Sequence, residues 1–398
     1  MKPILKSNSA LIAIGNNPSW TTGVDYGRLL SLVQGSNYSV SIPRQTSKSV
    51  GSDMLFLDDI SYAPEVEIQI QYNLSPFLNN EFLFGLKSES AAKGEYSAAL
   101  ETMASQNNNI YLLIEEQDGD AFDRPKNLQT DLSGFSAVNC GNCFMKSYSV
   151  NWSVGQIPQV STSFDAVNME FQKITGSLMP IPAINLASGN QDQRGNLAVD
   201  QLYLSLPSGF IIDNAENRTE YSASTALASA SRFDLQNLQC GGVNILNSDQ
   251  ALLQSFNISL DLQRTPMYGL GSNYVFGRKL LLPALGTASV TAIASGISSG
   301  EFTSMLTGES SYSFEIAFSD EKKLTTGLFS IEGAKLQSLS LEMGVNDSLN
   351  FSAQFSFAAY QSGGFLIKRD AEFEFEDYVF FNGSQLSFDG ETIYFLAE

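Results

Sequence analysis

The stretch that decides the fold is Leu252-Leu253-Gln254-Ser255-Phe256-Asn257-Ile258-Ser259-Leu260-Asp261-Leu262-Gln263-Arg264, which continues to Leu270-Gly271-Ser272. It repeats the earlier stretch Leu32-Val33-Gln34-Gly35-Ser36-Asn37-Tyr38-Ser39-Val40-Ser41-Ile42-Pro43-Arg44, which continues to Val50-Gly51-Ser52. The recurring residues lie a constant 220 positions apart (254 minus 34): Gln34, Arg44, Gly51 and Ser52 match Gln254, Arg264, Gly271 and Ser272. A repeat of this length predicts two related domains rather than a short solenoid unit.

A second pair of alternating segments supports the duplication. Residues 148–155, which end in Gly155, match residues 339–344, which end in Gly344. This offset is 189 (344 minus 155), so we expect the first copy to carry about 31 more residues (220 minus 189), within 86–140. The predicted organisation is a first module over 1–175 with that insertion, a connector or loop region over 176–250, and a second module over 251–398 with C-terminal strands.

Apolar and polar residues alternate along much of the chain, for example in Glu65–Tyr72 and Glu372–Glu376. This period is typical of antiparallel strands with one buried face and one wet face. The best helix signals lie in 88–105 and 219–233. The predicted fold class is therefore mainly β: two tandem related antiparallel β-sandwich or half-barrel modules, with one or two short helices and long loops.

The composition excludes several classes of enzyme. The 398 residues include no histidine, which removes Ser-His-Asp and Cys-His nucleophiles and most zinc and transition-metal sites. Charged residues make up 16% of the chain, and the many hydroxyl and amide side chains fit exposed strand faces and subunit contacts better than a helical enzyme. We therefore expect a protein that is not an enzyme, with no cofactor and no metal.

One pair of cysteines has the spacing of a redox or zinc site, in Cys140-Gly141-Asn142-Cys143. A zinc site needs four ligands, and Cys240 is the one cysteine left to join them. The second copy has nothing comparable near residue 332. The pattern favours a loop with two free thiols.

Acidic residues outnumber basic ones by 42 to 22, for a net charge of −20. This balance argues against gripping a phosphate backbone, which needs clustered Lys and Arg. Two acidic strand faces, with Glu65 and Glu67 on one and Glu372, Glu374 and Glu376 on the other, have two interpretations: ordinary solvated faces, or the lining of a channel with polyanionic contents. No apolar run is long enough for a membrane span or a signal peptide, so we expect folding in a cytosol and no membrane partner.

The repeated blocks resemble the strands of the tail tube proteins of long-tailed bacteriophages, in the fused two-module form of that family. The resemblance covers 32–84 and 139–168 in the first copy and 252–308 and 329–360 in the second. It implies a structural virion protein, assembled in the host cytoplasm and located in the tail. Three such chains would close a pseudo-hexameric ring, the rings would stack into a tube beside other tail proteins, and a negative lumen would conduct DNA during ejection without binding it specifically.

Two alternative functions stay open at this point. One is a distal tail or baseplate ring protein built on the same fold. The other is a carbohydrate-binding β-sandwich adhesin, for which Trp20, Trp152 and the fifteen tyrosines would supply stacking platforms.

Overall fold

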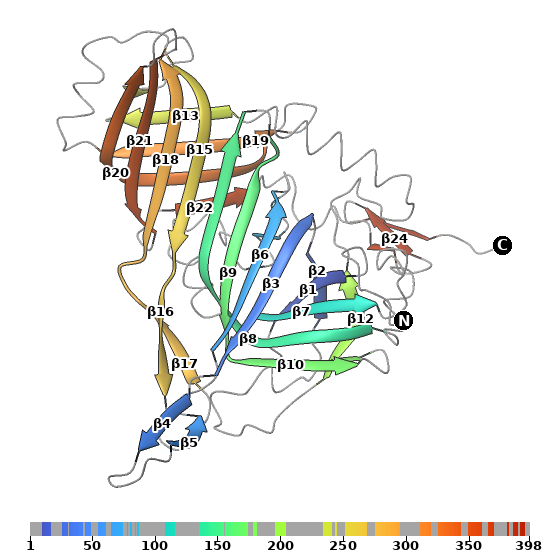
Figure 1. Cartoon of the computed structure of the whole chain (residues 1–398). Helices are drawn as coiled ribbons and strands as arrows, with labels where there is room; N and C mark the ends of the chain where they lie inside the picture. Colours follow the sequence, from blue (N-terminus) through green and yellow to red (C-terminus); the bar gives the residue numbers. More distant parts are fainter. Residues whose placement is uncertain are drawn as a thin grey trace, which may run out of the picture.

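The chain is mainly β and is built on a large antiparallel sheet, as the sequence predicts (Figure 1). The structure is a computed structural model. It describes residues 10–16, 26–30, 32–42, 44–48, 55–60, 65–74, 78, 80–81, 84, 86, 108–115, 135–154, 156–173, 178–180, 196–203, 234–240, 243–244, 251–268, 275–294, 311–319, 325–343, 349–359, 365–369, 380–381, 385–388 and 391–394. No helix in this described part is long and apolar enough to cross a membrane. The predicted helices at 88–105 and 219–233 lie outside it.

An antiparallel sheet of eight strands, here named the central sheet, runs through the molecule. Its first half has the order β3 (Val33–Ser41), β6 (Glu65–Asn73), β9 (Gln159–Ala166) and β8 (Phe135–Ser153). Its second half has the order β15 (Ala251–Asp261), β18 (Leu285–Ala294), β21 (Leu349–Ala358) and β20 (Thr325–Met343). The halves join where β8 pairs with β15.

The second half repeats the first, strand for strand and pair for pair. Adding 220 to both partners of the Gly35–Gln71 pair gives the Ser255–Thr291 pair. The register slips at the same place in both halves, at Gln34 in β3 and at Gln254 in β15. A β-bulge at equivalent positions is a specific feature of a backbone. The recurrence of Gln34 as Gln254 therefore marks a shared bulge.

The later strands correspond at a different offset from the one that the glycines indicate. Adding 191 to the Met145–Phe164 pair of β8 and β9 gives the Leu336–Phe355 pair of β20 and β21, and the same bulge follows in both halves. The predicted offset of 189 is therefore wrong by two residues. Since two is the period of a strand, the error leaves every side chain on its predicted face.

Each half also has a second layer of strands that runs across the central sheet (Figure 1). In the first half, this layer contains β2 (Tyr26–Leu29), β1 (Ala10–Asn16), β7 (Asn108–Glu115), the beginning of β8 and β10 (Asn168–Lys173). In the second half, it contains β14 (Val243–Asn244), β13 (Asp234–Cys240), β19 (Tyr312–Ser319), the beginning of β20 and β22 (Phe365–Arg369). The long strands β8 and β20 thus belong to both layers of their halves.

A bulge in each long strand lies near the point where it passes from one layer to the other. Asn142 in β8 and Gly333 in β20 both have a left-handed backbone, with φ of 52° and 69°, and they are 191 positions apart. Asparagine and glycine are residues that tolerate this region best. The Cys140-Gly141-Asn142-Cys143 segment is thus a bulged strand rather than the predicted loop, and its counterpart in the second half is Ile331–Ala334.

The remaining strands form peripheral units. Two hairpins project from the same end of the molecule (Figure 1): β4 (Arg44–Lys48) with β5 (Leu55–Ile60), and β16 (Arg264–Tyr268) with β17 (Val275–Leu280). The short strands β11 (Leu178–Pro180) and β12 (Asn196–Tyr203) extend the first second-layer sheet, and β23 (Phe380–Phe381), β24 (Gln385–Phe388) and β25 (Glu391–Tyr394) form a sheet of their own. The domain boundaries stay a prediction, although β13, from the stretch predicted as a connector, pairs with β19 of the second half.

A single apolar core lies between the central sheet and the second layers and extends through both halves. Strand β6 shows how the sequence builds it, because Val66, Ile68, Ile70 and Tyr72 are buried while the residues between them are not. At the joint between the halves, the ring of Trp152 from β8 packs on Phe256 from β15 and on Phe329 from β20, with centroid distances of 5.8 and 5.4 Å. The two halves therefore share core contacts.

Candidate functional site

The face of the central sheet that points away from the core, here named the polar face, is a functional candidate that extends over both halves. Strand alternation and register bring together here hydroxyl and amide side chains from both halves, in rows such as Ser161, Ser149, Ser259, Thr287 and Ser356. The charged side chains among the described residues of this face are five carboxylates and two lysines: Glu65, Glu67, Asp165, Asp261, Glu342, Lys146 and Lys335. The face is thus hydrophilic and weakly negative.

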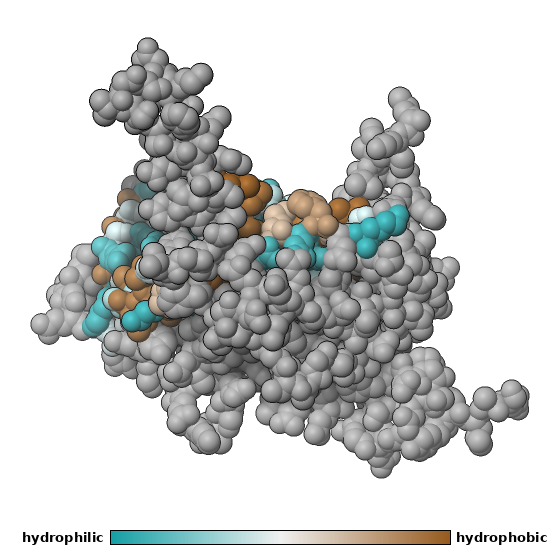
Figure 2. All heavy atoms as spheres, turned by 90° about the horizontal axis from the view of Figure 1, so that it is seen from below, coloured by the Kyte–Doolittle hydropathy of each residue, from teal (hydrophilic) through white to brown (hydrophobic). Residues whose placement is uncertain are grey.

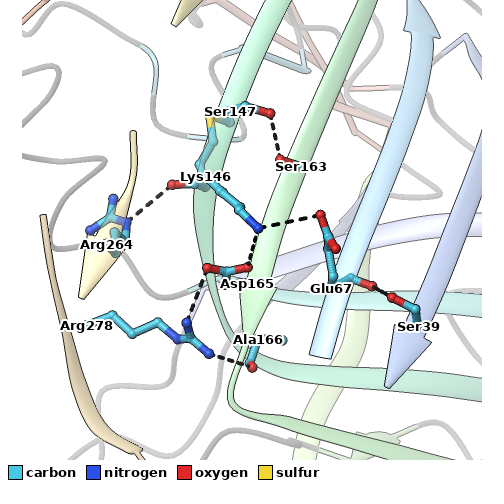
Figure 3. Close-up of polar contacts among 10 residues, drawn as sticks. Ser39, Glu67, Lys146, Ser147, Ser163, Asp165, Ala166, Arg264 and Arg278 are labelled. Atoms are coloured by element: carbon cyan, nitrogen blue, oxygen red, sulfur yellow. Dashed lines mark hydrogen bonds and ion pairs between the residues drawn. The ribbon is translucent and has the colours of Figure 1, made fainter. Parts of the chain in front are cut away.

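Most of this charge gathers at the β6–β9–β8 end of the face (Figure 3). Lys146 Nζ lies 3.7 Å from Glu67 Oε1 and 3.6 Å from Asp165 Oδ1. On the other side of Asp165, the Arg278 guanidinium donates to Asp165 Oδ2 at 3.2 Å and to the Ala166 carbonyl at 3.4 Å. Because Lys146 is the bulge residue of β8, its side chain reaches both neighbouring carboxylates.

Two arginines of the β16–β17 hairpin attach the second half of the chain to the first. Arg278 makes the contacts just described, and Arg264 Nε donates to the Met145 carbonyl at 3.2 Å while its guanidinium lies over the Phe144 ring. Burial lowers the pKa of Arg264 to about 10. The repeated arginine at position 264 is therefore a structural contact between the halves.

We expect Asp165→Asn to lower the free energy of unfolding by about 1–3 kcal/mol, since it leaves the largely buried Arg278 guanidinium without its carboxylate. Glu67→Gln is the matched control, because its ion pair with Lys146 is half exposed and such pairs contribute about 0–1 kcal/mol. Urea unfolding of both variants measures the difference. If the two substitutions lowered the free energy of unfolding equally, Asp165 would not be the carboxylate that the buried Arg278 guanidinium depends on.

The other residues singled out from the sequence are placed as follows. Glu65 is exposed on the polar face, next to Glu67 along β6. Arg44 begins β4 and pairs with Ile60, as Arg264 pairs with Leu280 in the second half. The remaining residues lie outside the described residues: Gly51, Gly155, Gly271, Gly344, Glu372, Glu374 and Glu376.

Burial bears on two of the chemical alternatives. Both thiols of the cysteine pair are buried, and burial raises the pKa of Cys140 to about 12 and that of Cys143 well above its usual value. Such thiols carry little thiolate, the reactive and metal-binding form. Trp152 has 1% of its surface exposed, so it cannot serve as a stacking platform for a carbohydrate, and Trp20 lies outside the described residues.

A buried carboxyl group that sequence patterns did not single out as functional lies in the core of the first half. Glu81 is fully buried, and its Oε1 accepts hydrogen bonds from the hydroxyls of Tyr72 at 2.7 Å and Tyr148 at 3.3 Å. Burial raises the pKa of Glu81 to about 7, against the opposing effect of these hydrogen bonds. The one available signal was the repeat itself, since Glu81-Phe82 recurs as Glu301-Phe302.

Exposed apolar side chains gather near the hairpin end of the molecule. Leu281, Leu282 and Leu285 lie between β17 and the beginning of β18 and are each about half exposed. Seen from this end, the described residues show hydrophobic and hydrophilic groups side by side (Figure 2). Exposed apolar residues that lie this close together are typical of contact surfaces between proteins.

Comparison with known proteins finds likeness among solved structures alone. No protein-family model matches the sequence, and no curated protein matches it. Among solved structures, a chain of the anti-feeding prophage baseplate, in a 6-fold symmetrised cryo-EM structure, is 9% identical. The match covers 44% of this chain and 99% of that chain, with a TM-score of 0.27.

Proposed function

We propose that this protein is a structural subunit of a phage tail tube, which assembles with copies of itself into stacked rings around a central channel. The observation that carries the proposal is the order of the central sheet, in which two equivalent four-strand halves follow one another in the same direction. A half that joins the next half in this head-to-tail way can join further copies by the same contact. Such contacts close a ring when the rotation between units is a whole fraction of a turn.

The polar face is the proposed lining of the channel. The second layers cover the other face of the central sheet, so in the described part of the chain this is the face that meets solvent and, in the proposed tube, passing DNA. Five carboxylates and two lysines give it a small negative charge, and the nearby hydroxyls and amides carry none. In this described part, DNA phosphates would meet two lysines among five carboxylates, so we expect DNA to pass without binding.

The exposed leucines near the hairpin end, Leu281, Leu282 and Leu285, suit the contact between successive rings. A ring that stacks needs a surface at its end as well as at its side, and apolar side chains buried between rings would supply association energy. We propose three chains per ring, with six equivalent halves, because the resemblance to fused two-module tail tube proteins implies that stoichiometry.

Electron microscopy of the purified protein at high concentration tests the proposal. We expect rings or hollow tubes whose end views have three-fold symmetry with six similar lobes. A protein that stays monomeric at every concentration, and that occurs in only a few copies per virion, would exclude a tube subunit. A few copies per virion in a single ring would instead favour a distal tail or baseplate ring protein.

A further inference from the structure

The two outer edges of the central sheet have the same structure as the two strands that meet at its internal joint. At the joint, β8 pairs with β15 through Tyr148–Leu260, Ser149–Ser259 and Val150–Ile258. Strand β3 is the counterpart of β15, and the second part of β20 is the counterpart of β8. Among the described residues, β3 pairs with β6 alone and residues 338–343 of β20 pair with β21 alone. Each edge therefore presents the backbone N–H and C=O groups whose equivalents form the hydrogen bonds between β8 and β15 in the joint.

Side-chain exposure differs between the joint and the edges at equivalent positions. Val40 and Ile42 are 50% and 45% exposed, whereas their counterparts Leu260 and Leu262 are 0% and 1% exposed. On the other edge, Leu341 is 51% exposed and its counterpart Val150 is 0% exposed. These three side chains are apolar although the described part of one chain leaves each of them about half exposed. A neighbouring strand in the geometry of the joint would cover them.

We propose that residues 338–343 of β20 pair antiparallel with β3 of a second copy, in the register of the internal joint. Adding 191 to the β8 residues of the joint gives their counterparts in β20, and subtracting 220 from the β15 residues gives their counterparts in β3. The pairs at the joint thus become Leu341–Tyr38, Ser340–Ser39 and Leu339–Val40. The apolar pairs then extend the core, and Ser340–Ser39 continues the polar face. One further backbone bond follows, since Leu262 N donates to the Lys146 carbonyl in the joint and Ile42 would donate to Gln337 of the neighbour.

The side chains beside this edge already have the arrangement of the joint. Ser149 Oγ donates to the Ser161 carbonyl at 3.4 Å, and its counterpart Ser340 Oγ donates to the Ser352 carbonyl at 3.5 Å. The edge of β20 therefore needs no rearrangement of these groups to accept a partner. The contact is heterologous, because it joins two different edges, and it leaves one free edge of each kind on every dimer. This inference rests on the proposed function and specifies the contact that would build the ring.

Cysteine crosslinking tests the register. In a chain with Cys240→Ser, the single variants Ser340→Cys and Ser39→Cys are mixed and oxidised with diamide, and we expect disulfide-linked dimers from the mixture but not from either variant alone. The control is a single chain that carries both Ser149→Cys and Ser259→Cys, the equivalent pair at the internal joint. It shows whether diamide forms a disulfide at this position of the register. Homodimers of Ser340→Cys alone would show that like edges pair. If the control chain formed its internal disulfide but the mixture of Ser340→Cys and Ser39→Cys formed no dimers, the proposed register would be overturned.

A charge variant tests the same contact without crosslinking. Val40→Asp is expected to abolish self-association in light scattering, whereas Val154→Asp, at a 69% exposed position outside both edges, leaves it unchanged. Equal association by both variants would overturn the contact. Electron microscopy of the same samples separates the two proposals: rings or tubes that form without the Ser340–Ser39 crosslink would retain the tube and exclude the contact. Crosslinked assemblies with no ring or tube would retain the contact and exclude the tube.

Discussion

Replacing Trp152 by alanine is expected to lower the free energy of unfolding by about 3–5 kcal/mol, which is the usual cost of removing a buried aromatic side chain. The ring is 1% exposed and packs on Phe256 and Phe329, which belong to the second half of the chain. Its removal would leave a cavity at the joint between the halves. We therefore expect the loss to appear in one unfolding transition, measured by urea titration with circular dichroism.

The matched control is Phe171→Ala, which removes an aromatic side chain that is 76% exposed. Surface substitutions of this kind usually change stability by about 0.5 kcal/mol or less. If Trp152→Ala cost no more than Phe171→Ala, the core contact between the halves would be refuted. A separate, unchanged transition for one half would show that the halves fold independently, contrary to the shared core.

The sequence predicted the fold class because strand periodicity and the repeat can both be read without knowing how the strands pair. Alternation in Glu65–Tyr72 identifies β6 and its buried face, and the repeated Gln34 and Gln254 mark the same bulge in both halves. The offset in the later strands was harder to determine, since a shift of two residues preserves the alternation that guided it. Strand pairs with their bulges fix the offset, and these require three-dimensional register.

The charges near the candidate site depend on contacts that no local pattern predicts. Glu67 was expected to be one of several like charges on a strand face, yet Lys146 lies between it and Asp165 because a bulge in β8 directs the lysine there. Arg278 reaches Asp165 from a hairpin 113 residues away in sequence. Exposure of the edges is likewise invisible in the sequence, because Val40 and Leu260 occupy the same place in the repeat and differ only in what covers them.

Stability is expected to fall by about 3 kcal/mol between pH 4 and pH 8 through Glu81 alone, since one pKa unit corresponds to roughly 1.4 kcal/mol. Burial raises the pKa of this carboxyl to about 7 from an ordinary value of 4.5. Between these values, the unfolded chain has released the proton while the folded chain retains it. The contribution is therefore fully present below pH 4.5 and is lost as the pH rises through about 7.

Glu81→Gln provides the test, because the amide keeps an oxygen that can accept from Tyr72 and Tyr148 but does not titrate. The difference in unfolding free energy between the native chain and this variant should change by about 3 kcal/mol from pH 4 to pH 8, in favour of the variant at the higher pH. Comparing the two chains at each pH cancels the titration of the other carboxylates. A difference that stays constant with pH would mean that Glu81 is ionised in the folded chain, and the second buried oxygen, Oε2, would then need a donor beyond the described residues.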